Sequence, residues 1–299
     1  MITWIKKGVS HLSTIHILAY FKKIPLLNKL LMPGSGLERM LGKVSTPFRN
    51  KIRQLIGGIY FETNIYGTKI KMIDYRTYDY YSLFSRGKIH EPALTLQLKT
   101  LFEKTNSPTF VDIGAHYGYF TIYAGKLIGS SGQVISIEPH IKFYGCLLKN
   151  IEINGLKEIV RTFNLALSDK EGKANMKGWD ERVLHEAENG NIQVITFDQL
   201  CENEGIRPDI IKIDVHGAEG KVLDGMPDIL KNKVSHLFCE LHKNMMGYTN
   251  SKIIQILENA GLEVFEFKKH REVSGGELVL ISSEFLSNYE DRMLYARRK

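Results

Sequence analysis

The sequence lacks the features that mark several classes of protein. It holds only three cysteines in 299 residues, too far apart for a compact metal motif: Cys146, Cys201 and Cys239. We therefore expect reduced thiols in the protein core, which indicates a cytosolic protein. No run of about 18 apolar residues is present, which excludes a transmembrane helix. The N-terminus lacks a compact apolar core followed by small residues, so we expect no secretory signal.

The stretch around which the chain is organised, Phe110–Thr121, lacks two common phosphate-binding patterns. It has neither the Gly-x-Gly-x-x-Gly dinucleotide fingerprint nor the Gly-Lys-Ser/Thr of a P-loop. Its pattern is an apolar strand, then Asp-x-Gly-x-x-x-Gly, then a helix. Gly114 and Gly118 let the backbone turn sharply and approach a ligand closely. The carboxylate of Asp112 would repel phosphate, so the turn favours a cationic or hydroxyl-bearing ligand. The plain alternative is an ordinary strand–helix turn.

Acidic residues are nearly missing from the first part of the chain. Residues 1–56 contain ten lysines and arginines and a single glutamate, whereas the whole chain has a net charge of +7. The rest of the chain is therefore slightly acidic. Apolar residues in this arm recur at helical spacing, which predicts basic amphipathic helices. Such an arm could lie on an anionic membrane surface, or it could be a lid on the protein body or a dimer contact.

An extension with its own secondary structure follows the basic arm. Residues 59–73 alternate between apolar and polar side chains on both sides of Tyr66-Gly67, which predicts a β-hairpin. The tyrosine-rich segment 75–85 is a candidate substrate-facing surface, and an amphipathic helix is expected from Pro92 to Glu103. We expect four parts in all: a basic helical arm (1–56), a hairpin and helix extension (57–105), an α/β domain (106–285) and a basic tail (286–299).

Apolar strands and amphipathic helices alternate from residue 108 onward. Repeated βαβ units of this kind require a mostly parallel sheet with helices on both faces. A last pair of strands with no helix between them implies an antiparallel strand at one edge. Residues 170–190 are polar, and we expect a loop with a short hairpin there. The seven expected strands are 110–113, 133–138, 159–167, 209–215, 234–241, 262–267 and 277–282.

Polar side chains gather at the carboxyl ends of the first three strands, where open α/β sheets bind ligands. Asp112 ends the first strand. Glu138 ends the second, about 20 residues after the glycine turn, a spacing at which a carboxylate accepts hydrogen bonds from ribose hydroxyls. With Asp169 after the third strand, the pocket is acidic, which disfavours a pyrophosphate and favours an adenosine linked to a cationic group. S-adenosylmethionine (SAM), with its sulfonium and ammonium groups, fits that description.

Four segments carry a resemblance to one family: Val111–Gly118, Ile137–Pro139, Lys212–Glu219 and Cys239–His242. Together they resemble the FkbM family of SAM-dependent methyltransferases, over roughly residues 90–270. The resemblance implies a Rossmann-like class I methyltransferase fold with strand order 3-2-1-4-5-7-6. It also implies O-methylation of a sugar or other hydroxyl in a natural product, lipid or polysaccharide. Two residues depart from the pattern: His116 stands where the family usually has Asn, and His216 where it usually has Glu.

The resemblance also implies roles at the cofactor end of the sheet. Glu138 is expected to hold the ribose hydroxyls, and the backbone of the glycine turn to approach the methionine part. Asp112 could hold the ammonium group, directly or through water, or brace the loop. Asp169 could reach the adenine amino group, with a surface turn as the alternative. The expected cofactor-binding residues are Asp112, Gly114, Ala115, His116, Gly118, Glu138, Pro139, Ser168 and Asp169.

The fourth and fifth strands each end in an acid and a histidine. Side chains two apart on a strand share a face, so Asp214 with His216 and Glu240 with His242 would form two neighbouring pairs. A histidine could take the proton of an attacking hydroxyl. Alternatively, these four groups could bind a divalent cation such as Mg, Mn or Zn. We favour a general base, His242 before Asp214 and then His216, because no compact metal motif is present; in a third alternative the histidines only support the loops.

Two further charged residues of the fourth-strand motif are assigned structural roles. Lys212 points toward the carboxylates of the pocket, and we expect it to pair with Asp112 or Asp214. Glu219 lies in the first turn of its helix, where a negative charge is favourable.

The function predicted from the sequence is SAM-dependent O-methylation of a glycan, glycolipid or related small-molecule acceptor. A catalytically impaired, membrane-peripheral binding or scaffold protein of the same fold is a second hypothesis, motivated by the basic arm and the two motif departures. An RNA methyltransferase is a third, since the arm could touch phosphates. The body of the chain is slightly acidic and has no aromatic-rich basic face, so nucleic acid is not the expected partner. The sequence names neither the acceptor nor the oligomeric state.

Overall fold

The computed structural model describes residues 59–74, 88–176, 184–242, 247–269, 271–272, 276–285 and 291–298. The predicted basic arm and the tyrosine-rich segment 75–85 lie outside the described residues. The chain divides into two compact units, one of residues 1–63 with 71–88 and the other of residues 64–70 with 89–299. Across the described part of the chain, no helix is long and apolar enough to span a membrane.

The predicted β-hairpin is present as a separate two-stranded sheet of β1 (Ile59–Ile65) and β2 (Thr68–Asp74). Its two-residue turn places both Tyr66 and Gly67 at positive φ, 48° and 90°. Such a turn matches the twist of the flanking strands. The side chain of Asn64 supports it by accepting a hydrogen bond from the Gly67 N–H at 2.8 Å.

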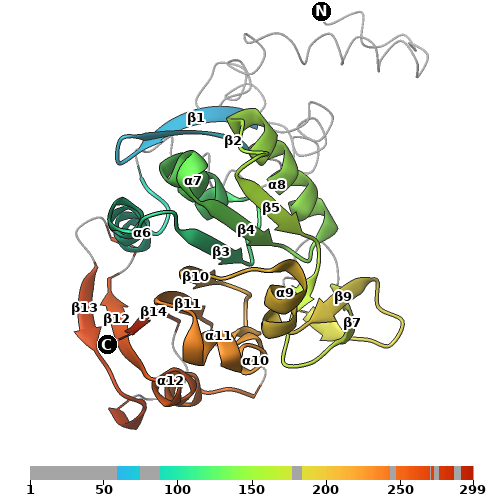
Figure 1. Cartoon of the computed structure of the whole chain (residues 1–299), viewed down its shortest axis with the longest axis vertical. Coiled ribbons are helices and arrows are strands. Elements are labelled where there is room, and N and C mark those ends of the chain that lie inside the picture. The colour runs from blue at the N-terminus through green and yellow to red at the C-terminus, as the bar shows by residue number, and fades with distance from the viewer. Residues whose placement is uncertain are drawn as a thin grey trace, which may run out of the picture. The chain divides into compact units, whose positions relative to one another are not determined.

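An eight-stranded sheet forms the centre of the second unit (Figure 1). In sheet order, its strands are β13 (Glu277–Leu280), β12 (Leu262–Lys268), β14 (Arg292–Arg298), β11 (His236–Leu241), β10 (Ile210–Ile213), β3 (Thr109–Ile113), β4 (Gln133–Ile137) and β5 (Val160–Phe163). The five strands from β11 to β5 are parallel to one another. β14 is antiparallel to both of its neighbours, and β13 is antiparallel to β12. The predicted class, an α/β Rossmann-like methyltransferase fold, is confirmed.

The C-terminal segment corrects the predicted strand order. The sequence predicts seven strands and a basic tail over 286–299, whereas the sheet has eight, and β14 takes the place between the fifth and sixth strands. The segment 277–282, expected as the seventh strand, supplies only the edge strand β13. The basic residues suggested a tail, but the four residues from Met293 to Ala296 are buried between two neighbouring strands. Arg292 begins the strand and donates to Glu266 Oε1 at 2.7 Å.

The third expected strand, 159–167, is divided between two sheets. β5 ends at Phe163, and β6 (Ala166–Leu167) belongs to a four-stranded sheet with β9 (Ile192–Ile195), β7 (Gly172–Met176) and β8 (Leu184–Glu186). Between them, the side-chain amide of Asn164 donates to the carbonyl oxygens of Glu138 and Pro139 at 2.8 and 3.0 Å. These bonds hold the turn at which the chain leaves the larger sheet. Within 170–190 a short hairpin was expected, and β7 and β8 pair antiparallel there as part of this second sheet, with residues 177–183 outside the described part of the chain.

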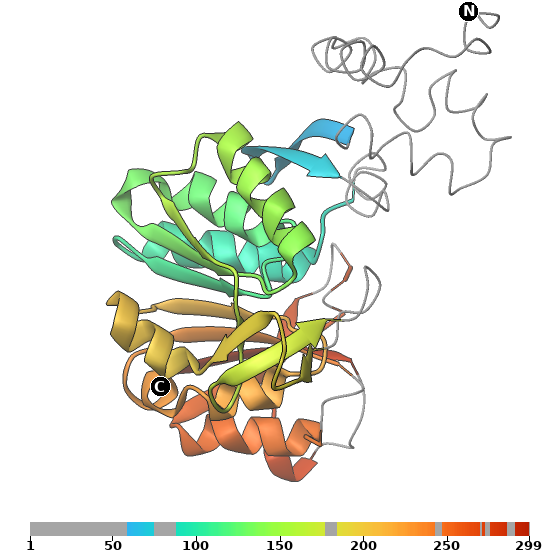
Figure 2. The same cartoon turned by 90° about the vertical axis from the view of Figure 1, so that its right-hand side faces the viewer.

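Helices cover both faces of the larger sheet, as expected (Figures 1 and 2). On one face, Val111 and Ile113 of β3 belong to a core cluster with residues of the last four helices. Asp112 points to the opposite face, where it bonds Thr121 of α7. The helices are α6 (Pro92–Lys104), α7 (Tyr119–Ile128), α8 (Ile141–Asn154), α9 (Phe197–Glu204), α10 (Glu219–Asp224), α11 (Pro227–Asn232) and α12 (Asn250–Asn259).

We predict that Leu294→Ala lowers the free energy of unfolding by about 2–5 kcal/mol, because truncation of a buried leucine leaves a cavity. Arg297→Ala, at an exposed position of the same strand, should change it by less than about 1 kcal/mol. Urea denaturation followed by circular dichroism measures both values. Equal and small effects of the two substitutions would contradict the assignment of β14. They would indicate that residues 292–298 form the tail expected from the sequence.

Candidate active site

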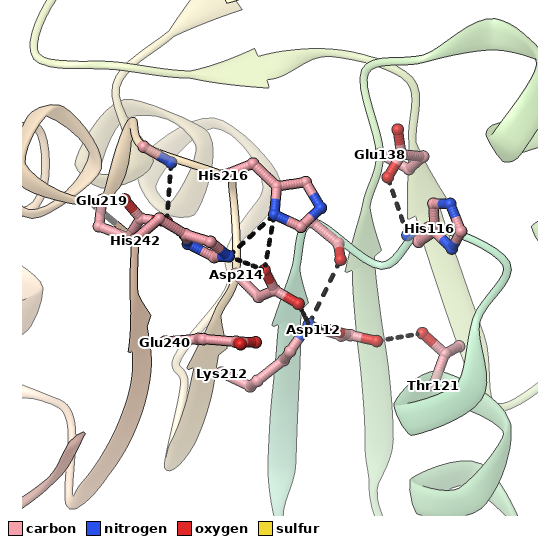
Figure 3. A network of polar contacts seen from close by, with 12 residues as sticks. Asp112, His116, Thr121, Glu138, Lys212, Asp214, His216, Glu219, Glu240 and His242 are labelled. Atoms are coloured by element: carbon pink, nitrogen blue, oxygen red, sulfur yellow. Dashed lines mark hydrogen bonds and ion pairs between the residues drawn. The ribbon is translucent and has the colours of Figure 1, made fainter. Parts of the chain in front are cut away.

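The carboxyl ends of four parallel strands carry most of the polar residues expected from the sequence (Figure 3). Asp112 belongs to β3, Glu138 follows β4, Asp214 follows β10 and His242 follows β11. Because these strands are neighbours in the sheet, their ends meet at one edge. The candidate site therefore lies where the sequence places it.

A buried lysine joins two of the strands beneath this edge. Lys212 Nζ, on β10, lies 3.2 Å from Asp112 Oδ1 and 3.4 Å from Asp214 Oδ2, and it donates to the carbonyl oxygen of Gly114 at 3.3 Å. Its side chain is only 4% exposed. Burial acts to lower the pKa of Lys212, but Asp112 and Asp214 raise it above its ordinary value, so the amine stays charged. Both pairings expected from the sequence are confirmed.

The carboxylate of Asp112 has polar neighbours at both of its oxygens. The residue is fully buried, and its Oδ2 accepts a hydrogen bond from Thr121 Oγ1 at 2.7 Å. Thr121 in turn shares a hydrogen bond of 2.8 Å with the hydroxyl of Ser136 on β4. With Lys212 beside the other oxygen, the carboxylate of Asp112 is held by side chains of two further elements, α7 and β10. Of the roles expected for Asp112, this arrangement supports the one in which it braces the loop.

Gly114 has a packing reason to be glycine that the motif alone does not reveal. Its φ is 77°, and a Cβ atom at this position would lie 1.9 Å from the backbone oxygen of Asp214. The N–H groups of Gly114 and Ala115 both donate to the carbonyl oxygen of Ile137, at 2.9 and 3.0 Å. The turn is thus fixed against β4 and against the loop after β10, and Gly118, with φ 88°, caps the start of α7.

Glu138 is held by two backbone donors. Its Oε2 accepts from the N–H of His116 and its Oε1 from the N–H of His140, both at 2.8 Å. Burial raises the pKa of Glu138 to about 7, although the two backbone hydrogen bonds favour the charged form. Each carboxylate oxygen keeps a further lone pair. The group can therefore accept hydrogen bonds from two neighbouring hydroxyls of a ligand.

The remaining expected cofactor residues come from two different sheets. His116 has φ 53°, and its ring centroid lies 4.1 Å from that of Phe143. Pro139 is half-buried after Glu138. Ser168 is buried and donates to Oδ1 of the exposed Asp169 at 2.9 Å, but both follow β6 of the smaller sheet. The structure therefore brings together the glycine turn and the end of β4. Ser168 and Asp169 belong instead to the smaller sheet.

Three side chains converge beyond the ends of β10 and β11 (Figure 3). His216 Nδ1 and His242 Nε2 are 3.0 Å apart, and Asp214 Oδ1 lies 3.6 Å from the first and 3.8 Å from the second. We call Asp214, His216 and His242 the acid–histidine cluster. The expected grouping is present, but its origin differs from the expected one. β10 ends at Ile213, and a left-handed backbone at His216, with φ 53°, brings the side chains together rather than a shared strand face.

Glu219 orients this cluster, whereas the sequence assigns it only a helix-dipole role. Its Oε1 accepts the N–H of Gly217 at 3.0 Å and lies 2.8 Å from His242 Nδ1. The carboxylate is fully buried, so it fixes the ring of His242 with Nε2 facing Asp214. The sequence did hold a signal, since an acid two residues after a glycine turn can fold back onto the N–H of that turn.

Negative charge dominates the electrostatics of the cluster. Burial acts to lower the pKa of His242, but the hydrogen bond and charge of Glu219, together with Asp214, raise it to about 9. Burial acts to raise the pKa of Asp214, but Lys212 and the two histidines lower it to about 2. In this arrangement Asp214 is ionised and His242 carries a proton at neutral pH. His242 therefore does not keep the near-neutral pKa of an ordinary histidine, on which its choice as the general base depends.

Glu240, the fourth residue of the expected pairs, is separate from the cluster. Among the described residues, the acid–histidine cluster forms a group whose ligand atoms lie within 4.8 Å of one another, and Glu240 is not a member. Its Oε1 instead accepts from Arg271 Nη2 at 3.1 Å, and Arg271 Nε lies 3.4 Å from Glu91. Burial and the nearby Glu240 raise the pKa of Glu91 to about 7. Arg271 and Glu91 were not expected at the site, because both lie outside the motifs.

His90 is a further neighbour that no motif predicts. It lies before α6, and its ring centroid is 5.1 Å from that of Tyr119 and 5.7 Å from that of Phe120. Burial lowers the pKa of His90 to about 4, against the opposing charge of Asp214. The site thus contains a neutral imidazole close to an ionised carboxylate.

Comparisons with known proteins identify the family of the chain. The family model described as the methyltransferase FkbM domain matches residues 112–264, just over half of the chain. No curated protein matches the sequence. Among solved structures, the O-methyltransferase of Bacillus cereus in complex with SAH is 17% identical with a TM-score of 0.42, over 70% of this chain and 81% of that chain. The SAM-dependent methyltransferase of Agrobacterium tumefaciens is 14% identical with a TM-score of 0.45, over 81% of this chain and 70% of that chain.

We predict that Lys212→Met lowers the free energy of unfolding by about 3–5 kcal/mol, because it leaves two buried carboxylates without their counter-charge. Lys231→Met, on the exposed surface of α11, serves as the control and should change it by less than about 1 kcal/mol. Chemical denaturation at neutral pH provides both values. A Lys212→Met protein as stable as the control would show that the two carboxylates do not depend on this amine.

Proposed function

The chain belongs to the FkbM family of methyltransferases, and on that premise we propose that it transfers the methyl group of SAM to a hydroxyl oxygen of a glycan, glycolipid or related natural product. The observation that carries the oxygen acceptor is the contact of 2.8 Å between the buried carboxylate of Glu219 and His242 Nδ1. An alcohol has to lose its proton as its oxygen attacks a methyl carbon. A carboxylate-oriented histidine beside Asp214 and His216 supports removal of that proton at the acid–histidine cluster, by the fraction of His242 that has lost its own proton.

The cofactor end of the site fits this methyl donor. When bound, SAM supplies a methyl group on a positively charged sulfur, which leaves as a neutral thioether with the electrons of the carbon–sulfur bond. Glu138 would hold the ribose hydroxyls, because its two oxygens each have a lone pair beyond the backbone bonds they accept. The glycine turn braced by Asp112 and Lys212 would support the methionine part. Of the expected adenine contacts, Asp169 is exposed and belongs to the smaller sheet, so its role stays a prediction.

The surroundings of the cluster support a neutral, hydroxyl-rich acceptor. Asp214, Glu240 and Glu91 all bear carboxylates on this side of the site, and Arg271 pairs with two of them. Carboxylates accept hydrogen bonds from hydroxyls and repel phosphates. The same argument disfavours RNA as the acceptor. The oriented Glu219–His242 pair also supports an active enzyme over a scaffold protein that has lost turnover.

The full-length protein tests this function when it is incubated with methyl-labelled SAM and an extract of cell-envelope glycans and glycolipids. We expect label in a hydroxylated product as a methyl ether. His242→Ala should reduce the rate of label transfer by about 10²–10⁴-fold, the usual contribution of a positioned proton-transfer group. Its affinity for SAM, measured by calorimetry, should stay within about threefold, because His242 belongs to the acceptor side of the edge.

His236→Ala is the matched control, since His236 lies at the other end of β11 and bonds Tyr295 instead. It should transfer label at nearly the normal rate. A wild-type protein that binds no SAM would end the proposal. Near-normal turnover by His242→Ala would leave a methyltransferase but remove the assignment of proton transfer to the cluster.

Glu138→Gln should weaken SAM binding by about 10–100-fold, because a hydrogen bond to a charged acceptor is worth about 1.5–3 kcal/mol. Since burial raises the pKa of Glu138 to about 7, SAM affinity of the wild-type protein should also fall as the pH drops through 7. Protonation occupies one oxygen and removes the charge that accepts the ribose hydroxyls. Calorimetry between about pH 6 and 8.5 should show this slope for the wild type and a flatter profile for the variant. Identical profiles would exclude Glu138 as the titrating group.

A further inference from the structure

The acid–histidine cluster has the geometry of a metal site. Its three facing atoms are separated by 3.0, 3.6 and 3.8 Å, so the point equidistant from them lies about 2.0 Å from each. Divalent first-row cations bind imidazole nitrogen and carboxylate oxygen at about 2.0–2.2 Å. We propose that Asp214 Oδ1, His216 Nδ1 and His242 Nε2 bind one divalent transition-metal cation. The side chains need little movement to do so.

His216 Nδ1 and His242 Nε2 share a hydrogen bond of 3.0 Å, which a cation between them would replace, and the surroundings of the three atoms suit a cation. Asp214 Oδ1 is buried and makes no hydrogen bond to the described residues, its nearest partners being the two imidazole nitrogens. Glu219 Oε1 lies 2.8 Å from the other ring nitrogen of His242, Nδ1. A carboxylate behind a histidine in this way is the usual support of a metal ligand, because it fixes the tautomer and directs the other nitrogen outward. A carboxylate oxygen without a hydrogen bond and a histidine oriented by a carboxylate are both suited to a bound cation.

The donor set also indicates which cations would bind. Two imidazole nitrogens favour zinc, cobalt, nickel or iron over magnesium and calcium, which prefer oxygen ligands. Three protein ligands leave at least one coordination position open, as in catalytic rather than structural sites. Glu240 does not close that position, since it is paired with Arg271. The open position is therefore available to an oxygen of the acceptor.

The role of the cation rests on the proposed O-methylation. When the acceptor hydroxyl binds the open position, the cation lowers its pKa. The O–H bond breaks with both electrons left on oxygen, and the proton passes to solvent water. The oxygen then forms the bond to the methyl carbon, while the carbon–sulfur bond breaks with its electrons going to sulfur. His242 acts here as a ligand, and a free imidazole is not needed to take the proton.

A bound cation replaces the general base that the sequence favours, and it gives His242 of the proposed function the role of a metal ligand. That preference depended on the absence of a compact metal motif. The ligands instead come from two loops, with His216 and His242 separated by 26 positions, and they meet because β10 and β11 are neighbouring strands. A motif of fixed spacing cannot show ligands that are brought together in this way.

Titration of the metal-stripped, full-length protein with Co²⁺ tests the site without any acceptor. We expect one Co²⁺ per chain, with visible absorption bands of a low-coordinate nitrogen and oxygen site, and displacement of these bands by Zn²⁺. His242→Ala and His216→Asn should each weaken binding by more than about 100-fold, since each removes a ligand, and Glu219→Gln should weaken it by about 10–100-fold. Asparagine is chosen at position 216 because it tolerates the left-handed backbone there. His236→Ala should bind normally.

Calorimetry with SAM and far-UV circular dichroism confirm that each variant is folded. The metal site would be overturned if the wild type bound neither Co²⁺ nor Zn²⁺. It would also be overturned if the His216 and His242 variants bound Co²⁺ as tightly as the wild type does. Label transfer that survives exhaustive chelation would overturn its catalytic role. In either case, SAM binding and methyl transfer by the wild type would still stand, so the failure of this inference is distinct from a failure of the proposed function.

Discussion

The buried amine of Lys212 is the interaction on which the rest of the site depends. It lies between the carboxylates of Asp112 and Asp214, at 3.2 and 3.4 Å, and over the ring of Phe120 with its Nζ 5.2 Å from the ring centroid. An unpaired charge at Lys212 or Asp112 would be strongly unfavourable, because both side chains are buried, and Asp214 is only partly exposed. The three groups therefore hold one another in place. Lys212 itself bonds the carbonyl oxygen of Gly114 in the glycine turn, and Asp214 belongs to the acid–histidine cluster.

The same constraint explains why the two halves of the site are adjacent. The loop after β3 and the loop after β10 touch at Gly114, where no side chain fits against the backbone of Asp214. In the proposed function, the cofactor end and the acceptor side of the site are thus built from residues that pack directly on each other. The charged groups buried at the contact between these two loops hold fixed positions. Proton removal and methyl transfer both require side chains in fixed positions.

The sequence predicted the core of the fold well, and its failures have physical causes. β3, β4 and β11 are short apolar runs with clear ends, and the structure places their termini within about two residues of those expected. β14 was missed because its four apolar residues stand among arginines, and only pairing on both sides makes such a segment a strand. The site was predicted in part. Asp214, His216 and His242 were grouped correctly from a premise about strand faces that does not hold, while Glu219 and Arg271 reach the site through contacts between distant segments.

The position of β14 also affects how the protein is made. β11 carries Glu240 and leads directly to His242, and one of its hydrogen-bonding edges is covered only by β14. During synthesis β11 and β12 emerge from the ribosome before Arg292–Arg298, so both expose unpaired edges that can associate with other nascent chains. A chain that stopped after β13 would contain every residue of the site and still lack the strand that closes the sheet beneath it.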